Sequence, residues 1–305
     1  MSMTLRPINR KLAPVSGDIL ADDPDELAFI HSTFCSCALP YRSPPELVYQ
    51  RSTGRASLMV ASGWRKDEKT DELVPTGIPY GPKPRLVLLH AFTEAVRRQS
   101  REIPIAETLS GYLRDDLGAN TDTRTLRTYR EQLRRLAKAS VTIEWSDPAS
   151  GRHVIQDAKP FSRLELWGEA DANQRELWPS AITLGADFFD SLIEHAVPLD
   201  QRAIAALKHN ARALDLYAWL AHRLHRIKAP TFISWQALAG QFGGASQIDT
   251  DTRMTSFKGK LMDALVQAHQ VYPKARIEKV RGGINLMKSP PPVKTITVQG
   301  SDLLT

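Results

Sequence analysis

Residues 121–139 read Thr-Asp-Thr-Arg-Thr-Leu-Arg-Thr-Tyr-Arg-Glu-Gln-Leu-Arg-Arg-Leu-Ala-Lys-Ala, and this stretch contains the strongest structural signal in the chain. Its apolar residues recur at intervals of three, four and three residues: Leu126, Tyr129, Leu133 and Leu136. That spacing places them on one face of an α-helix. The stretch therefore predicts a helix over 122–139 that buries this face, with Tyr129 as a core residue rather than a nucleophile.

A second face of the predicted helix is basic. Six basic and two acidic side chains lie between residues 122 and 138. The arginine fork matches phosphate oxygens and the guanine edge, and an α-helix fits the DNA major groove. Threonines at the helix start suit phosphate contacts. The alternative is a solvated basic face with no ligand. We favour DNA, and the candidate contacts on this helix are Thr123, Arg124, Arg127, Arg130, Arg134 and Lys138.

The segments around this helix predict a winged helix. Apolar periodicity indicates helices over 85–99 and 106–117, with a short extended piece over 103–105 between them. Strands over 141–145 and 153–156, joined by a polar turn, follow the third helix. Helix, short strand, helix, helix and a two-stranded hairpin is the element order of a winged helix, which is a variant of the helix-turn-helix.

The same order returns downstream. The expected elements are a helix over 210–226, a strand over 231–234, helices over 235–242 and 252–270, and strands over 276–280 and 284–287. The string Thr121-Asp-Thr-Arg124 also recurs as Thr250-Asp-Thr-Arg253, at an offset of 129. We interpret the two regions as copies of one supersecondary unit.

The second copy contains its own basic residues. Recognition helices place base-reading side chains in their N-terminal half, and a basic hairpin can contact a phosphate backbone or the minor groove. The alternative for the hairpin is a charged edge strand that discourages aggregation. The candidate DNA contacts here are Thr252, Arg253, Ser256, Lys258 and Lys260 on the helix and Arg276, Lys279 and Arg281 on the hairpin.

These patterns predict an α+β fold that is mainly helical, with two tandem winged-helix domains and a flexible N-terminal arm. Residues 27–34 are expected to form a short apolar helix, and residues 47–62 a hairpin that turns near Gly54. The expected divisions are an arm over 1–45, a first domain over 46–167, a linker over 168–179, a second domain over 180–293 and a tail over 294–305.

Composition excludes several classes of protein. The 305 residues are 42% hydrophobic and 24% charged, which is typical of a globular chain and not of a disordered or collagen-like one. No stretch approaches the ~18 apolar residues of a membrane span, and the N-terminus has no secretion signal. We therefore expect a cytoplasmic protein without a membrane partner. The net charge of +6 favours a polyanionic partner only weakly.

The sequence offers little support for catalysis. It has neither a Walker-type phosphate loop nor a dinucleotide fingerprint, and it has no His-x-His pair. Two cysteines, Cys35 and Cys37, are too few for a zinc cluster of their own. We expect a non-enzymatic protein that needs no metal or cofactor. The enzyme alternative, a nickase or recombinase, stays open to test.

Many short motifs make the chain similar to the plasmid-encoded RepA replication initiators over residues 27–293. Their number and order carry the resemblance. They are Leu39-Pro-Tyr-Arg42, Pro79-Tyr-Gly-Pro-Lys-Pro-Arg85, Ser100-Arg-Glu-Ile103, Glu131-Gln-Leu-Arg-Arg-Leu136, Phe188-Phe189, Pro198-Leu-Asp200, Ala213-Leu-Asp-Leu-Tyr-Ala-Trp-Leu220, Ile233-Ser-Trp235, Gln241-Phe-Gly243, Tyr272-Pro273 and Ser289-Pro290. The stretch Gly244–Thr250 departs from the family by lengthening a turn, which leaves open which of Thr250–Arg253 caps the following helix.

The resemblance implies a plasmid replication initiator that binds repeated origin sequences (iterons) in double-stranded DNA, helps to open the duplex and recruits host DnaA and the replicative helicase. Dimers of similar initiators often repress their own promoter, so a homodimer is also implied. The alternative is a winged-helix transcriptional regulator, or autorepressor, without a role in replication. Base-contacting residues are not defined by motifs in this family, so the candidate contacts above rest on charge and helical phase.

Overall fold

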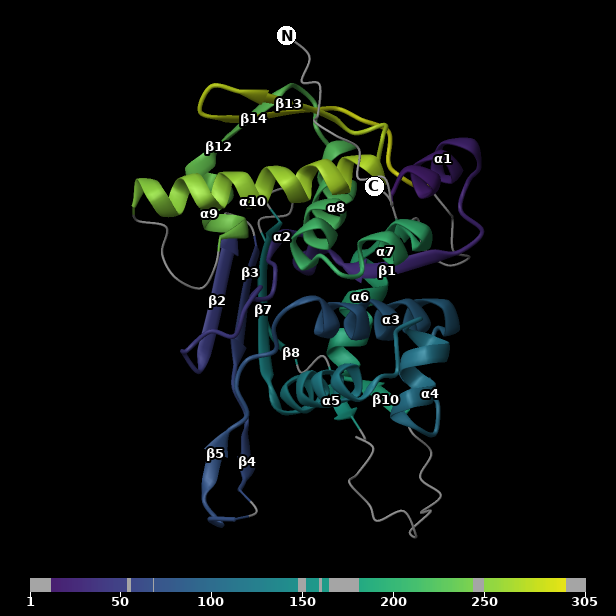
Figure 1. Cartoon of the computed structure of the whole chain (residues 1–305), viewed down its shortest axis with the longest axis vertical. Helices are drawn as coiled ribbons and strands as arrows, with labels where there is room; N and C mark the ends of the chain where they lie inside the picture. The colour runs from purple at the N-terminus through teal and green to yellow at the C-terminus, as the bar shows by residue number, and fades with distance from the viewer. Residues whose placement is uncertain are drawn as a thin grey trace.

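The computed structural model describes residues 12–53, 56–67, 69–147, 152–158, 161–164, 181–243 and 250–294. The fold is α+β, with helices and small antiparallel sheets. Within the described residues, the buried apolar side chains form two clusters. The first core includes Phe92, Tyr129 and Leu133, and the second core includes Trp219, Phe242 and Phe257. Helices of the first core occupy the lower half of Figure 1 and those of the second core the upper half.

The three helices predicted for the first unit are present. They are α3 (Pro82–Arg98), the short α4 (Leu109–Gly111) continued by the π-helical turn η1 (Tyr112–Asp116), and α5 (Thr123–Lys138). Strand β6 (Glu102–Pro104) takes the place of the predicted extended piece. Gly118 follows η1 with a φ of +54°, a conformation that glycine adopts without steric cost and that ends the helix.

The strands predicted as the first wing belong to another sheet. β7 (Ser140–Asp147) and β8 (Arg152–Ala158) extend the hairpin β2 (Val48–Thr53) and β3 (Ala56–Ala61), in the order β2-β3-β7-β8. Val141 and Ile143 of β7 are buried and pair with Val60 and Leu58 of β3. Because alternate residues face the core, this burial fixes the register of β7 on β3.

A different strand pair completes the first unit. β9 (Phe161–Leu164) and β10 (Ala181–Leu184) join β6 in the order β6-β10-β9. The following helix α6 (Ala186–His195) also contributes to the first core. Residues 181–195 therefore contribute to the first core, whereas the expected boundary placed them in the second domain. A four-residue strand has no local pattern that identifies its sheet. The predicted linker over 168–179 lies outside the described residues.

The second unit has the element order predicted from its sequence. Its elements are α8 (Ala211–Leu224), β12 (Thr231–Ser234), α9 (Trp235–Phe242), α10 (Asp251–Gln270), β13 (Arg276–Val280) and β14 (Gly283–Met287). The sheet order is β12-β14-β13. In both units the last strand therefore lies between the strand that precedes the second helix and the strand that follows the third helix.

Residues 12–45 belong to the expected N-terminal arm, and they form α1 (Ala13–Ala21), β1 (Leu27–His31) and α2 (Ser32–Ser36). Residues 27–31 were expected to be helical, but they pair antiparallel with β11 (Ala196–Asp200). Leu27 and Phe29 enter the first core and Ala28 enters the second, so β1 lies between the two cores. Alternate residues of this apolar run face opposite cores, which is the period of a strand buried on both faces.

The remaining elements connect or extend these units. The hairpin of β4 (Trp64–Lys66) and β5 (Leu73–Pro75) precedes α3, and α7 (Gln201–Leu207) links β11 to α8. Val293, close to the end of the described chain, packs in the first core. In the part of the chain that the structure describes, no helix combines the length and apolar character needed to cross a bilayer.

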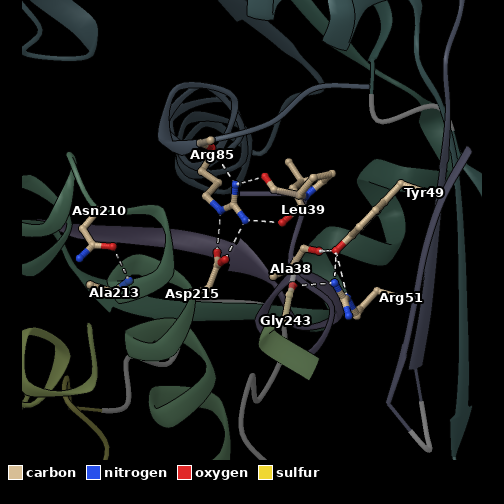
Figure 2. Close-up of polar contacts among 11 residues, drawn as sticks. Ala38, Leu39, Tyr49, Arg51, Arg85, Asn210, Ala213, Asp215 and Gly243 are labelled. Carbon is tan, nitrogen blue, oxygen red and sulfur yellow. Dashed lines mark hydrogen bonds and ion pairs between the residues drawn. The ribbon is translucent and has the colours of Figure 1, made fainter. Parts of the chain in front are cut away.

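A buried ion pair joins the two units (Figure 2). Arg85 of α3 donates from Nε and Nη2 to the two carboxylate oxygens of Asp215 of α8, each at 2.8 Å. The remaining guanidinium donors bind the carbonyl oxygens of Leu39, Pro40 and Gly81. Arg85 is 6% exposed and Asp215 8% exposed, so both charges are removed from water and each is paired.

Removing one charge of this pair should be strongly destabilising. Arg85→Met leaves the Asp215 carboxylate buried without its partner, and we expect the free energy of unfolding to fall by about 3–5 kcal/mol. Adding Asp215→Leu should restore only part of this loss, because the three carbonyls stay without their donors. Urea unfolding followed by circular dichroism measures both values. Arg114→Met, which breaks an exposed pair with Asp115, is the control and should have little effect. An Arg85→Met protein as stable as this control would contradict the prediction.

A second buried polar group is a neutral histidine. His31, at the end of β1, is fully buried, and burial lowers its pKa to about 3, with smaller contributions from His195 and His222. Nδ1 accepts a hydrogen bond from the Thr33 backbone N–H at 3.1 Å, and Nε2 lies 3.0 Å from the Ser191 hydroxyl. Because Nδ1 is an acceptor, the neutral ring has its proton on Nε2, and a second proton would face the Thr33 N–H.

Stability should therefore decrease in mild acid. The unfolded chain binds a proton at His31 below the ordinary pKa of about 6.5, whereas the folded chain does so only near pH 3. The contribution of His31 is complete above pH 6.5 and is lost as the pH falls, by about 2 kcal/mol between pH 7 and pH 5. His31→Asn keeps an acceptor for Thr33 but does not titrate, so its unfolding free energy should depend less on pH. Equal pH dependence in the two proteins would refute this assignment.

Candidate nucleic-acid interface

Helix α5 begins at the predicted position. Asp122 is its N-cap and accepts hydrogen bonds from the Thr125 backbone N–H at 2.9 Å and the Thr125 hydroxyl at 2.6 Å. These two bonds, the hydroxyl first, lower the pKa of Asp122. Tyr129, Leu133 and Leu136 are buried as predicted. The cap and this face together fix which side of α5 meets the solvent.

The basic residues of α5 occupy its accessible side. Thr123, Arg124, Arg127 and Lys138 are exposed, and Arg130 and Arg134 are partly buried. Arg135 is different, because it donates to Glu131 at 2.8 Å and to the Ile78 carbonyl at 3.1 Å, with its guanidinium over the Tyr80 ring. Arg135 therefore holds α5 to the preceding segment, whereas Arg124 and Arg127 are exposed to solvent.

A groove of about 540 Å³ runs beside this basic side. Four cationic side chains and two aromatic rings line it: Lys83, Arg127, Arg130, Arg134, Tyr41 and Tyr80. The groove also contains Glu131, whose carboxylate is already paired with Arg135. Nε of Arg130 is buried and has no hydrogen-bond partner among the described residues. The charge balance of the groove favours an anion.

Lys83 was missed by the sequence analysis as a candidate contact. It extends from the first turn of α3 to the Thr128 hydroxyl and lies 5.0 Å from the centre of the Tyr129 ring. Burial lowers its pKa. The motif Pro79-Tyr-Gly-Pro-Lys-Pro-Arg85 contains Lys83 and Tyr80, but no helical phase in the sequence connects this segment with α5.

Helix α10 is capped by Thr250, whose hydroxyl accepts a hydrogen bond from the Arg253 backbone N–H at 3.3 Å. This contact answers which of Thr250–Arg253 is the cap. Phe257, Leu261 and Leu265 are buried, at positions i, i+4 and i+8 of the helix. The predicted contacts Thr252, Arg253, Ser256 and Lys260 are exposed, and Lys258 is partly buried.

The basic hairpin of the second unit, β13–β14, turns beside the start of α9. Arg276 and Lys279 of β13 and Arg281 of the turn are exposed. Gly282 has a φ of +90°, and its carbonyl accepts a hydrogen bond from the Trp235 backbone N–H at 2.9 Å. The turn thus brings Arg281 to the N-terminal end of α9, where backbone N–H groups also favour anions.

The structure gathers the predicted contacts into two sets. One set lies on α5 in the first unit, and the other lies on α10 and the β13–β14 hairpin in the second. Within the described residues, no group of three His, Cys, Asp or Glu side chains could hold a metal ion. Cys35 and Cys37 are buried, and burial raises the pKa of both thiols, that of Cys37 to about 11.

Comparison with known proteins gives the family. The family described as "Plasmid encoded RepA protein" matches residues 78–237, which is more than half of the 305 residues. The chain belongs to this RepA family. The match includes α3, α5 and the start of the second unit, so it covers the helix on which the first set of contacts lies. No curated protein matches the chain.

Two solved structures resemble the RepA-family chain distantly. Domains 2–3 of RctB (residues 155–483) are 12% identical with a TM-score of 0.48, over 83% of this chain and 94% of that one. A selenomethionine derivative of domains 2 and 3 of RctB is 11% identical with a TM-score of 0.46, over 84% of this chain and 98% of that one. The family assignment rests on the RepA match alone.

Two glycines near the candidate helices should respond oppositely to alanine. Gly259 lies in the middle of α10 with no atom within 4 Å of an added Cβ, so Gly259→Ala should raise the free energy of unfolding by about 0.5–1 kcal/mol. At Gly63, before β4, an added Cβ would lie 2.1 Å from the Lys138 carbonyl oxygen at the end of α5. Gly63→Ala should therefore destabilise the protein. Thermal unfolding compares the two, and effects of the same sign would contradict the packing described here.

Proposed function

We propose that this RepA-family protein is a plasmid replication initiator that binds repeated sequences in double-stranded origin DNA through two winged-helix domains. One observation carries the proposal: helix, strand, helix, helix and two strands occur twice, with the same strand order in both sheets. In each copy the third helix turns its polar side outward. The RepA match supports a role in plasmid replication.

The third helices, α5 and α10, would enter major grooves. Arginines on the accessible side of α5 suit base edges and phosphates, and hydroxyls at the start of α10 suit phosphates. The proposed contacts are Thr123, Arg124, Arg127, Arg130, Arg134 and Lys138 in the first domain, and Thr252, Arg253, Ser256, Lys258, Lys260, Arg276, Lys279 and Arg281 in the second. We add Lys83, because it lies with Arg127 in the groove beside α5.

The arrangement of the cores supports a revised division of the chain. We propose a first domain from β2 to α6 and a second domain from α7 to β14, because α6 packs in the first core and α7 in the second. Residues 12–45 would brace both domains, since β1 contributes to both cores. Host DnaA, the replicative helicase and a second copy of the chain are the partners proposed from the family. We also propose that the protein acts in the bacterial cytoplasm.

Footprinting on the plasmid region that flanks the gene tests this function, at fixed salt and with random competitor DNA. We expect protection of regularly spaced direct repeats. Arg127→Ala should cost about 1–3 kcal/mol of binding free energy at the repeats and relax sequence preference, whereas Lys279→Ala should weaken specific and random DNA alike. Arg114→Ala, away from both sets, is the control.

Other footprints would change the proposal. Protection of only a short palindrome upstream of the gene would favour a transcriptional regulator, and a failure to support plasmid maintenance would agree with it. Absence of any protection that withstands competitor DNA would overturn sequence-specific binding. Equal losses on specific and random DNA for every arginine would refute base reading by α5.

A further inference from the structure

An arginine of the first unit holds the end of a helix of the second. Arg51 lies on β2, the edge strand of the sheet β2-β3-β7-β8. Its guanidinium donates from Nη1 to the Gly240 carbonyl and from Nη2 to the Gly243 carbonyl, the latter at 2.9 Å. Figure 2 shows this side chain crossing from the strand to Gly243.

The two carbonyls belong to a helix end that needs donors. Helix α9 ends at Phe242, and the last four carbonyls of a helix have no partner within it. A cation there satisfies these oxygens and also offsets the negative end of the helix dipole. Arg51 is therefore a C-terminal cap of α9 supplied by the other unit.

The guanidinium is itself held in place. The Tyr49 hydroxyl accepts hydrogen bonds from Arg51 Nε at 3.0 Å and Nη2 at 2.8 Å, and it donates to the Ala38 carbonyl at 3.0 Å. Tyr49 is buried in the first core. A side chain fixed in this way loses less entropy on binding the carbonyls than a free surface arginine would.

Helix α9 in turn positions α10. Phe242, at the end of α9, is buried in the same core as Phe257 of α10. A second contact, from the Gln241 side chain to the Ser36 carbonyl at 2.9 Å, also holds this end of α9 to the N-terminal segment. Contacts from outside the second unit thus fix the part of α9 from which the chain continues toward α10.

We infer that Arg51 is a positioning residue for α10: it caps α9 from the first unit and so sets the placement of the second DNA-reading helix relative to the first. This inference rests on the proposed function for the role of α10, but the contact itself does not. Arg51 would not touch DNA. Its loss should weaken binding through α10 and leave binding through α5 intact.

The test compares full-length wild type, Arg51→Met, Arg51→Lys and Arg97→Met. Arg97 is a matched control, because it also donates to a backbone carbonyl. Its partner is Leu27, so this contact joins α3 to β1 and not to α9. Hydrogen exchange without DNA is measured at the backbone amides of 239–243 and 251–257. We expect at least tenfold faster exchange in Arg51→Met, an intermediate effect in Arg51→Lys, which has one head group for two carbonyls, and no change in Arg97→Met.

Footprints of the same proteins give the second readout. Lys260→Ala identifies the positions protected by α10, and Arg127→Ala identifies those protected by α5. In Arg51→Met, binding affinity at the positions protected by α10 should fall at least tenfold more than affinity at the positions protected by α5. Unchanged exchange relative to Arg97→Met, or a uniform loss over both sets, would overturn the inference. If wild type protects no specific site but exchange responds as expected, the proposed function fails while the capping contact stands.

Discussion

The arrangement of this protein depends on the buried pair of Arg85 and Asp215. A buried charge is tolerated only when it is paired and its remaining donors are satisfied. Arg85 meets both conditions, because the carboxylate takes two of its N–H groups and three backbone carbonyls take others. Few arrangements of α3, α8 and the chain at Leu39–Pro40 would satisfy all of these groups, so the pair specifies how the two units meet.

The short segment Ala38–Pro40 links this pair to a second network. Its carbonyls accept hydrogen bonds from Tyr49 on one side and from Arg85 on the other. Tyr49 holds Arg51, which reaches α9, and Arg85 holds α8. The two units thus share a polar junction built on backbone oxygens, with β1 packed between their apolar cores. We attribute the relative orientation of α5 and α10 to this junction.

The long helices of the two units could be predicted from the sequence, whereas the partners of the strands could not. Apolar periodicity placed α5, α8 and α10 within about two residues, because apolar side chains at helical spacing are buried along each helix. Strand β7 was predicted, yet its sheet was not, because pairing depends on contacts far away in the sequence. Strand β1 resembled a helix because it is apolar on both faces.

The residues of the candidate site likewise divide into those that the sequence predicts and those that only tertiary packing places. Charge and phase along α5 predicted which arginines are accessible, since both are properties of one helix. Lys83, Tyr41 and Tyr80 reach the groove only through tertiary packing, so no local pattern could place them beside Arg127. The N-terminal segment could not be placed for a related reason, because the strand partner of β1 is β11, which lies far away in the sequence.

The pairing of β1 with β11 also governs when the protein can fold during its synthesis. Domains generally fold in order as they leave the ribosome, N-terminal first. Here Leu27 pairs with Asp200, and Val293 packs in the first core, so that core stays incomplete until most of the second unit has been translated. The first core therefore cannot be completed long before the second unit has been translated. Until residue 200 has been translated, β1 is an apolar strand without its partner, and the nascent chain is most exposed to aggregation in that interval.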